Sequence, residues 1–266
     1  MPPSRKRARR YDPARTRTAV LAQFAHVRAA VRGLTPEQLA GPTRLGDWTV
    51  RELAAHLTMG LSHLVRMLEQ PEPALAAPEV ALLDWPFSTA DRAAPIADGT
   101  KALAADRPDL DALYGEVAER FEELVPGAPE DRLLQAPAGT MRLADFLVTR
   151  TVELVVHTDD LNDAAGLDIP YDRQALAACT RLLADALADR APGGSVEVRI
   201  PPFAVVQCVQ GPKHTRGTPP NVVETDPLTW IRLATGRTTW ERALDAAKLD
   251  ASGERADLSA LLPLMR

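Results

Sequence analysis

Residues 151–161 read TVELVVHTDDL, an apolar stretch with a helical pattern that also carries Glu153, His157 and Asp160. Arg150 stands directly before it. Spacings of three, four and three residues keep these four side chains on one face of a helix. That face is the apolar one, which a helix normally turns toward the core. The outer face of the same helix carries Thr151, Thr158, Asp159 and Asn162. We therefore expect the four polar side chains on the apolar face to point inward, where charges are costly unless they are paired or bind an ion.

Two interpretations fit this inward-facing group. One is an internal salt-bridge network, in which Arg150 pairs with Glu153 or Asp160 and His157 is an ordinary core histidine. The other is a metal site, because Glu and His at positions i and i+4 reach the same point from one helix face. Helical bundles commonly build metal sites in their cores in this way. Two ligands are not enough, however, so a further ligand must come from elsewhere in the chain.

A second predicted helix, from about Val50 to Leu68, offers this further ligand. His56 lies at the border of its apolar stripe, and His63 shares that side seven residues later. On spacing alone, either histidine could complete the set across the bundle. A His/Glu/His set leaves one coordination position open, which is typical of catalytic rather than structural zinc sites.

The regular segments that the pattern predicts in the first 165 residues are all helices. Capping boxes at Thr35–Gln38 and Thr49–Glu52 mark two helix starts. Five prolines between residues 70 and 99 predict a long connecting loop. We predict that residues 126–141 are a connector, and that the other helices span 13–34, 100–125 with a disturbance at Pro108, and 142–165. This order predicts an up-and-down four-helix bundle.

Beyond Pro170 the pattern changes to a mixture of helices and strands. We predict strands at 195–200, 203–210 and 221–225, and helices at 172–190, 226–236, 240–246 and 258–262. This pattern is typical of an α+β domain. We therefore expect a basic disordered tail at residues 1–12, a helical bundle at 13–168 and a smaller α+β domain at 169–266.

Composition excludes several classes of protein. The chain has 266 residues, 45% hydrophobic and 25% charged, and a net charge of −5, which does not suit a polyanion-binding protein. The basic start MPPSRKRARRY lacks the apolar core of a secretory signal, and no stretch is long and apolar enough to span a bilayer. The two cysteines, Cys179 and Cys208, are interpreted as small buried hydrophobic residues. We expect a soluble cytoplasmic protein with no nucleic-acid partner.

Two segments resemble a known family. LGDWTVRELAAHL, which contains His56, and TVELVVHTDDL are similar to the motifs of the mycothiol-dependent maleylpyruvate isomerase family. That family has a DinB-like four-helix bundle whose metal is held by two histidines and one glutamate. The resemblance implies His56, Glu153 and His157 as metal ligands, and Asp160 as a hydrogen-bond partner of a ligand. His63 has no counterpart in the motif, and geometry alone places Arg150 beside the site.

The end of the chain carries a second, looser resemblance. The segment from residue 222 to 265, which contains DPLTWIRLATGR, is similar to the closing part of sterol-carrier-like domains. Such a domain follows the metal-binding bundle in many actinobacterial relatives. Together the two resemblances cover most of the chain after Tyr11 and imply a DinB-like bundle followed by a sterol-carrier-like α+β domain.

The resemblance implies an enzyme with a divalent metal, zinc in first place, and mycothiol or a similar thiol as cosubstrate. The metal lowers the pKa of the thiol, and the thiolate attacks a small electrophile, which is isomerised or conjugated. The alternative is a non-catalytic carrier, in which the C-terminal domain binds a lipid or another apolar ligand and the metal is structural or lost.

One further cluster of polar residues falls between two predicted strands. The segment GPKHTRG supplies Lys213, His214 and Arg216. These residues could clamp an anionic substrate or the polar end of the thiol. The alternative is an ordinary solvated turn.

Overall fold

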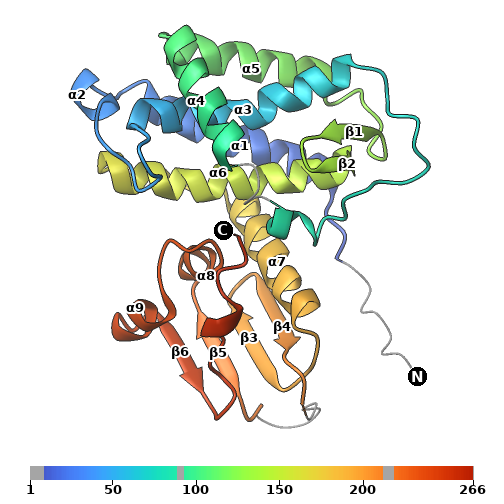
Figure 1. The fold of residues 1–266 in the computed structure, drawn as a ribbon, viewed down its shortest axis with the longest axis vertical. Helices are drawn as coiled ribbons and strands as arrows, with labels where there is room; N and C mark the ends of the chain where they lie inside the picture. The colour runs from blue at the N-terminus through green and yellow to red at the C-terminus, as the bar shows by residue number, and fades with distance from the viewer. Residues whose placement is uncertain (1–8, 89–92, 212–218, 266) are drawn as a thin grey trace.

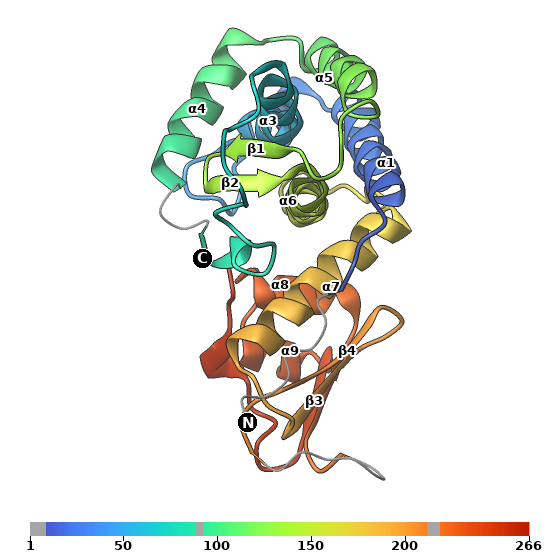
Figure 2. The same cartoon turned by 90° about the vertical axis from the view of Figure 1, so that its right-hand side faces the viewer.

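The computed structural model describes residues 9–88, 93–211 and 219–265. Four helices form a closed bundle: α1 (Pro13–Val31), α3 (Val50–Glu69), α5 (Leu110–Leu124) and α6 (Leu143–Ala165). Helix α1 packs against α5 and α6, and α3 packs against the same two helices (Figures 1 and 2). The expected helical bundle is therefore present, with α6 on the side that faces the second half of the chain.

Local sequence signals explain where these helices begin. Both expected capping boxes form, one at the start of the short helix α2 (Pro36–Leu39) and one at the start of α3. In the second box, the Thr49 amide donates to Glu52 Oε2 at 2.6 Å and the Glu52 amide donates to Thr49 Oγ1 at 3.3 Å. Each such cap contributes about 1 kcal/mol to helix stability. The second box fixes the residue at which α3, the helix that carries His56, begins.

The region predicted as a helix from residue 100 to 125 with a disturbance at Pro108 contains two helices, and the disturbance is a complete break. Helix α4 (Ala93–Asp106) ends before Pro108, and α5 begins after it. Proline disfavours helical backbone in the residue before it and has no amide hydrogen to donate. Asp109 then starts α5, since its side chain accepts a hydrogen bond from the Ala112 amide at 3.0 Å. Helix α4 also begins earlier than expected, and it packs along α3.

The segment predicted as a plain connector contains a β-hairpin. Strands β1 (Leu133–Ala136) and β2 (Gly139–Arg142) pair in antiparallel fashion directly before α6. The long loop after α3 is tied to this hairpin, because Glu79 Oε2 accepts a hydrogen bond from the Thr140 amide at 2.9 Å. The loop also contains a 3₁₀ turn, η1 (Trp85–Ser88), with Trp85 buried. The hairpin and the loop form one end of the bundle.

The second half of the chain is the expected α+β unit. Strands β3 (Val196–Ile200), β4 (Ala204–Cys208), β5 (Val222–Thr225) and β6 (Leu249–Ser252) form a sheet in the order β4-β3-β5-β6, with only the β3–β5 pair parallel. Helix α7 (Arg173–Arg190) contacts β4 and α8 (Pro227–Ala234) of this unit, and also α1 and α6 of the bundle. Helix α9 (Trp240–Asp245) precedes β6. Strand β6 was not predicted, and the expected last helix is a 3₁₀ turn, η3 (Ser259–Leu261).

Part of the expected disordered tail is packed on α7. Arg9 Nε donates to Asp185 Oδ2 at 2.8 Å, and the side chain of Tyr11 packs against the core. These two contacts explain why residues 9–12 take a defined position. The prediction of disorder considered only the many basic residues of this segment. Residues 1–8 lie outside the described residues.

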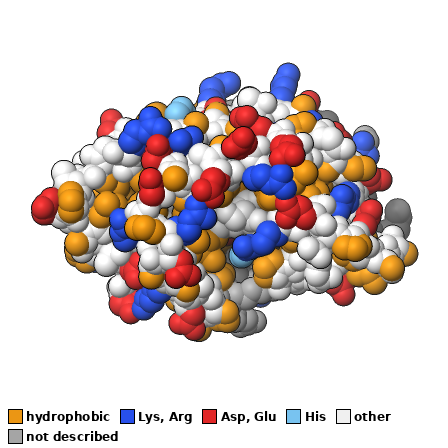
Figure 3. Space-filling view, turned by 90° about the horizontal axis from the view of Figure 1, so that it is seen from above, with side chains coloured by type: hydrophobic (Ala, Val, Ile, Leu, Met, Phe, Trp, Pro, Cys, Tyr) orange, Lys and Arg blue, Asp and Glu red, His pale blue; other side chains and the backbone are white. Residues whose placement is uncertain are grey.

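None of the described helices has both the length and the hydropathy that a membrane crossing requires. On the face shown in Figure 3, acidic and basic side chains alternate without a continuous field of either sign.

Candidate metal centre

Helix α3 holds His56 in a fixed orientation. The ring of the buried Trp48 lies 4.9 Å from the His56 ring, and His56 Nδ1 lies 3.2 Å from Thr100 Oγ1 on α4. Since the Thr100 hydroxyl donates to Met59 Sδ at 3.3 Å, its oxygen is free to accept a hydrogen bond from Nδ1. This assignment leaves the lone pair of His56 on Nε2, the atom that faces Glu153.

Helix α6 brings the other two side chains to the same point. Glu153 Oε2 lies 3.8 Å from His56 Nε2 and 3.5 Å from His157 Nε2. The two imidazole rings meet edge to face, with their centroids 4.8 Å apart. One candidate ligand atom from each residue lies within 4.8 Å of the others. On the far side of the His157 ring, Nδ1 donates to Asp160 Oδ2 at 2.8 Å, so Nε2 of this histidine also points toward Glu153.

The electrostatics of the trio favour an ionised glutamate. Burial opposes the charge of Glu153, but the neighbouring His157, His56 and Arg150 favour the ionised carboxylate and together hold its pKa well below the usual range. Burial lowers the pKa of His56. Burial also opposes the charged form of His157, yet Asp160 and Glu153 raise its pKa. Two imidazoles around one carboxylate are a donor set of the kind that binds zinc, and each histidine has the outer hydrogen bond that zinc ligands usually have.

The trio lines a cavity of about 140 Å³ that opens at the hairpin end of the bundle. Most of its wall is apolar, with contributions from Leu57, Trp85, Ile96 and Phe146. His63, seven residues after His56 on α3, also lines this cavity, but it is not part of the trio. Burial, with help from the neighbouring Arg66, lowers the pKa of His63 to about 4, so this imidazole is neutral at neutral pH.

Arg150 lies in the wall of the same cavity without a carboxylate partner. Its guanidinium stacks 4.4 Å above the Phe146 ring centroid and donates to Thr149 Oγ1 at 3.0 and 3.1 Å. Within the described part of the chain, no carboxylate lies within ion-pair distance of it. The salt bridge from Arg150 to Glu153 or Asp160, which the network interpretation required, is therefore absent. Burial lowers the pKa of this guanidinium, and Glu153 partly offsets the effect.

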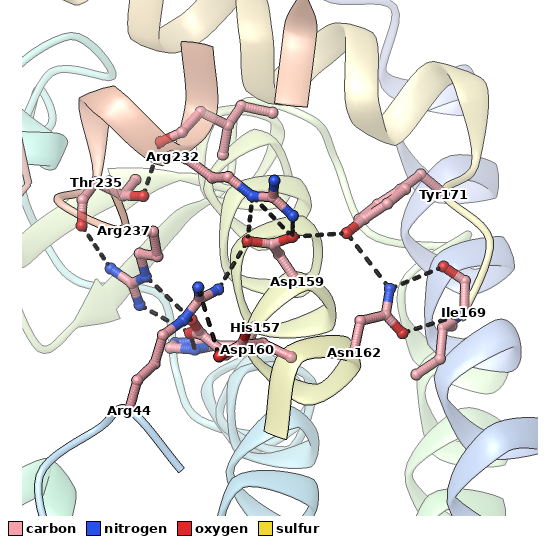
Figure 4. A network of polar contacts seen from close by, with 12 residues as sticks. Arg44, His157, Asp159, Asp160, Asn162, Ile169, Tyr171, Arg232, Thr235 and Arg237 are labelled. Carbon is pink, nitrogen blue, oxygen red and sulfur yellow. Dashed lines mark hydrogen bonds and ion pairs between the residues drawn. The ribbon is translucent and has the colours of Figure 1, made fainter. Parts of the chain in front are cut away.

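Asp160 belongs to a second network, which joins the bundle to the α+β unit (Figure 4). Besides His157, it accepts hydrogen bonds from Arg44 Nε at 2.6 Å and from Arg237 Nη2 at 2.8 Å. Asp160 is fully buried, and although burial opposes its charge, hydrogen bonds to His157 and Arg237 hold its pKa far below the usual range. The side chain that orients His157 is thus itself held from both halves of the molecule.

Asp159 is the second carboxylate of this network, although the helical pattern placed it on the outer face of the bundle. Its side chain is 3% exposed, because Arg232, Arg44 and Tyr171 enclose it. Arg232 Nη2 donates to Asp159 Oδ1 at 2.6 Å, Arg44 Nη2 donates to Oδ2 at 2.7 Å, and the Tyr171 hydroxyl donates to Oδ1 at 3.2 Å. The expectation of a solvent-facing Asp159 is wrong, because one helix viewed alone does not reveal which domain packs on it.

The remaining predicted residues have simpler outcomes. Lys213, His214 and Arg216 lie outside the described residues. Cys179 and Cys208 are both buried and unpaired, as expected. Burial raises the pKa of the Cys208 thiol to about 11, so neither the position nor the acidity of this cysteine suits a nucleophile. Sequence reasoning missed Arg44, Arg232 and Arg237, whose spacing along the chain gives no sign that they meet.

Comparison with known proteins gives two matching family models. Residues 20–162 match the model described as the mycothiol maleylpyruvate isomerase N-terminal domain, and residues 172–264 match the bacterial SCP ortholog model. No curated protein matches the chain. The first model covers more than half of the 266 residues, and both ligand-bearing helices, α3 and α6, fall within it.

Solved structures with a similar fold include the mycothiol-dependent maleylpyruvate isomerase, with a TM-score of 0.57 and 16% identity over 93% of this chain and 95% of that one. A variant of that isomerase with one histidine replaced by alanine matches with a TM-score of 0.56, also at 16% identity. At this identity the likeness shows the fold alone. It confirms the predicted class, a helical N-terminal domain followed by a smaller α+β domain.

Proposed function

Because the chain belongs to the family of the mycothiol maleylpyruvate isomerase N-terminal domain, as its motifs predicted, we propose that it is a metal-dependent thiol transferase or isomerase. In this proposal a low-molecular-weight thiol, mycothiol or a close relative, reacts with a small electrophile. The observation that carries the proposal is the meeting of His56, Glu153 and His157 within 4.8 Å at the wall of a cavity.

The chemistry of this donor set fits a divalent ion, and zinc is our first assignment. Two neutral imidazoles and one carboxylate are the ligands of many catalytic zinc sites, which keep a further position for substrate. A zinc ion held there would lower the pKa of a coordinated thiol and so supply a thiolate at neutral pH. Asp160 and Thr100 fix the outer nitrogens of the two histidines, which keeps both Nε2 atoms directed at the site.

The remaining walls would position the electrophile. Leu57, Trp85 and Phe146 provide an apolar surface that excludes water from the reacting thiol. Arg150 presents a guanidinium without a carboxylate partner to the same cavity, so it would offset negative charge that develops on the thiol or the electrophile. In this proposal neither cysteine of the chain takes part, since both are buried and neither lines the cavity. The two unpaired thiols also support our proposal that the protein works in the reducing cytoplasm.

A second candidate function rests on the match of residues 172–264 to the bacterial SCP ortholog model. In that case the α+β unit would carry an apolar ligand and the metal would be structural. The two functions separate experimentally, because an organic extract of the purified protein contains stoichiometric lipid only for a carrier.

Elemental analysis of the purified protein is the first test. We expect about one zinc or similar ion per chain in the wild type, loss of the ion in His157→Ala, and retention in His63→Ala. The second variant is the matched control, because His63 lines the cavity outside the trio. Consumption of mycothiol with a model electrophile should then depend on the ion. A metal-free wild type that also fails to bind added zinc would contradict the proposal.

A further inference from the structure

A second cavity lies between the two halves of the chain and shares no lining residue with the cavity of the metal centre. Its volume is about 270 Å³. Arg44 and Asp163 line it from the bundle, and the segment from α8 to β6 supplies the rest of its wall. Five of its side chains are cationic and one is a carboxylate: Arg44, Arg232, Arg237, Arg242, Lys248 and Asp163.

The cationic side chains exceed the carboxylates that could neutralise them. Arg44, Arg232 and Arg237 are paired with Asp159 and Asp160, as described above. The lining carboxylate, Asp163, is 59% exposed and lies 3.8 Å from Arg44 Nη1. Five cations therefore face three carboxylates, which leaves an excess of two positive charges.

That excess resides on two side chains, Arg242 and Lys248. Within the described residues, neither side chain makes an ion pair or a hydrogen bond; only their backbone groups are engaged. Two unpaired cations that converge on one concave site raise the local concentration of anions. The cavity is smaller than the pockets that hold drug-sized ligands, so its ligand must be small.

We propose that this interdomain cavity binds a small dianion with a phosphate group, such as a phosphate monoester. Guanidinium groups present parallel N–H donors that match phosphate oxygens, and a lysine ammonium adds a compact charge. The Thr238 hydroxyl, which also lines the cavity, supplies a neutral donor. Since Arg44 comes from the bundle and Arg242 and Lys248 come from the α+β unit, the bound anion would tie the two halves together. This proposal does not depend on the metal centre or its reaction.

The test is a titration of the full-length protein with inorganic phosphate and with phenyl phosphate, followed by calorimetry and by the thermal midpoint Tm. We expect saturable binding and a rise in Tm. The double variant Arg242→Ala/Lys248→Ala should weaken binding about tenfold, because it removes two solvent-exposed ion pairs with the ligand. A double variant at exposed positions away from the cavity, Arg15→Ala/Arg142→Ala, removes the same charge and should bind phosphate as the wild type does.

Each alternative result would overturn the proposal. Absence of saturable binding of both probes, or equal affinity in the wild type and Arg242→Ala/Lys248→Ala, would show that the cavity is not the site. An equal loss of affinity in the control double variant would show a general effect of net charge. Tighter binding of succinate than of phosphate would show that the site takes dicarboxylates. The metal content of all variants, measured in parallel, should equal that of the wild type, which separates this test from that of the metal centre.

Discussion

Replacing Asp160 with asparagine removes one negative charge from the point where the metal centre and the interdomain network meet. The carboxylate is fully buried and accepts hydrogen bonds from His157 Nδ1 at 2.8 Å, Arg44 Nε at 2.6 Å and Arg237 Nη2 at 2.8 Å. An asparagine in this place keeps one acceptor oxygen but turns an NH₂ group toward donors. Two guanidinium groups and one imidazole therefore compete for a single neutral oxygen.

The expected loss of stability follows from this geometry. Removing one partner of a buried ion pair typically costs about 3–5 kcal/mol. The side chains of Arg44 and Arg237 are 26% and 18% exposed, so water can solvate part of the charge that the variant releases. We therefore expect the free energy of unfolding of metal-free Asp160→Asn to fall by about 2–3 kcal/mol. We also expect about 10- to 100-fold weaker zinc binding, because the outer hydrogen bond of His157 is weakened.

Asp163→Asn is the matched control, one helical turn farther along α6. Asp163 is 59% exposed and lies 3.8 Å from the same arginine, Arg44. Loss of such an exposed pair costs about 0.5 kcal/mol or less. Urea unfolding of the metal-free proteins measures the stability change, and competition with a chromogenic chelator measures zinc affinity. If Asp160→Asn matches Asp163→Asn in both measurements, Asp160 neither holds His157 nor secures the domain contact.

Three further predictions concern the cavity and the cysteines. In Gly60→Ala the new Cβ would lie 2.6 Å from Arg150 Nη1, so the guanidinium must move and thiol-dependent turnover should fall several-fold. The control is Gly99→Ala, whose Cβ would meet only a methionine methyl at 3.5 Å. This variant should leave turnover unchanged and add about 0.5–1 kcal/mol to the free energy of unfolding. His63 has a pKa of about 4 in the folded protein and about 6.5 in the unfolded chain, so the unfolded chain binds more protons between these pH values. The free energy of unfolding should therefore fall as the pH drops from 6.5 to 4. Urea titrations at several pH values should show a smaller dependence on pH in His63→Gln. Iodoacetamide at pH 8 should label neither cysteine in the native protein and both in urea, and labelling of the native protein would show that the buried thiols become accessible.

Helix α6 shows what the sequence alone could and could not predict. Periodicity placed Glu153 and His157 on one face, and the structure brings them to the same point as His56 from α3. Their assignment as metal ligands stays a prediction, as do the boundaries of the domains. The same periodicity assigned Asp159 to solvent, since the outer face of a bundle helix looks alike whether water or another domain covers it. The one sequence signal for the arginine network was the pair of adjacent aspartates, Asp159 and Asp160, on this helix.

Other misses have equally local causes. The β1–β2 hairpin has only four residues in each strand, which is too short for an alternating pattern to stand out between prolines. The break between α4 and α5 was marked by Pro108, because a helix rarely continues through a proline. Arg232 lies 73 residues from Asp159, Arg237 lies 77 residues from Asp160, and Arg44 lies 115 and 116 residues from the two aspartates. No local pattern encodes contacts at such distances.

The shared role of Asp160 explains why the contact between the two halves is polar at this point. One carboxylate accepts hydrogen bonds from an imidazole and two guanidiniums, so rotation of the His157 ring would break a bond that the α+β unit helps to hold. An apolar contact could join the domains equally well, but it could not orient a histidine nitrogen. Arg237 reaches His157 only through Asp160, and Arg44 bridges Asp159 and Asp160. The orientation of a candidate ligand in the bundle therefore depends on the docking of the α+β unit, although none of the three candidate ligands comes from that unit.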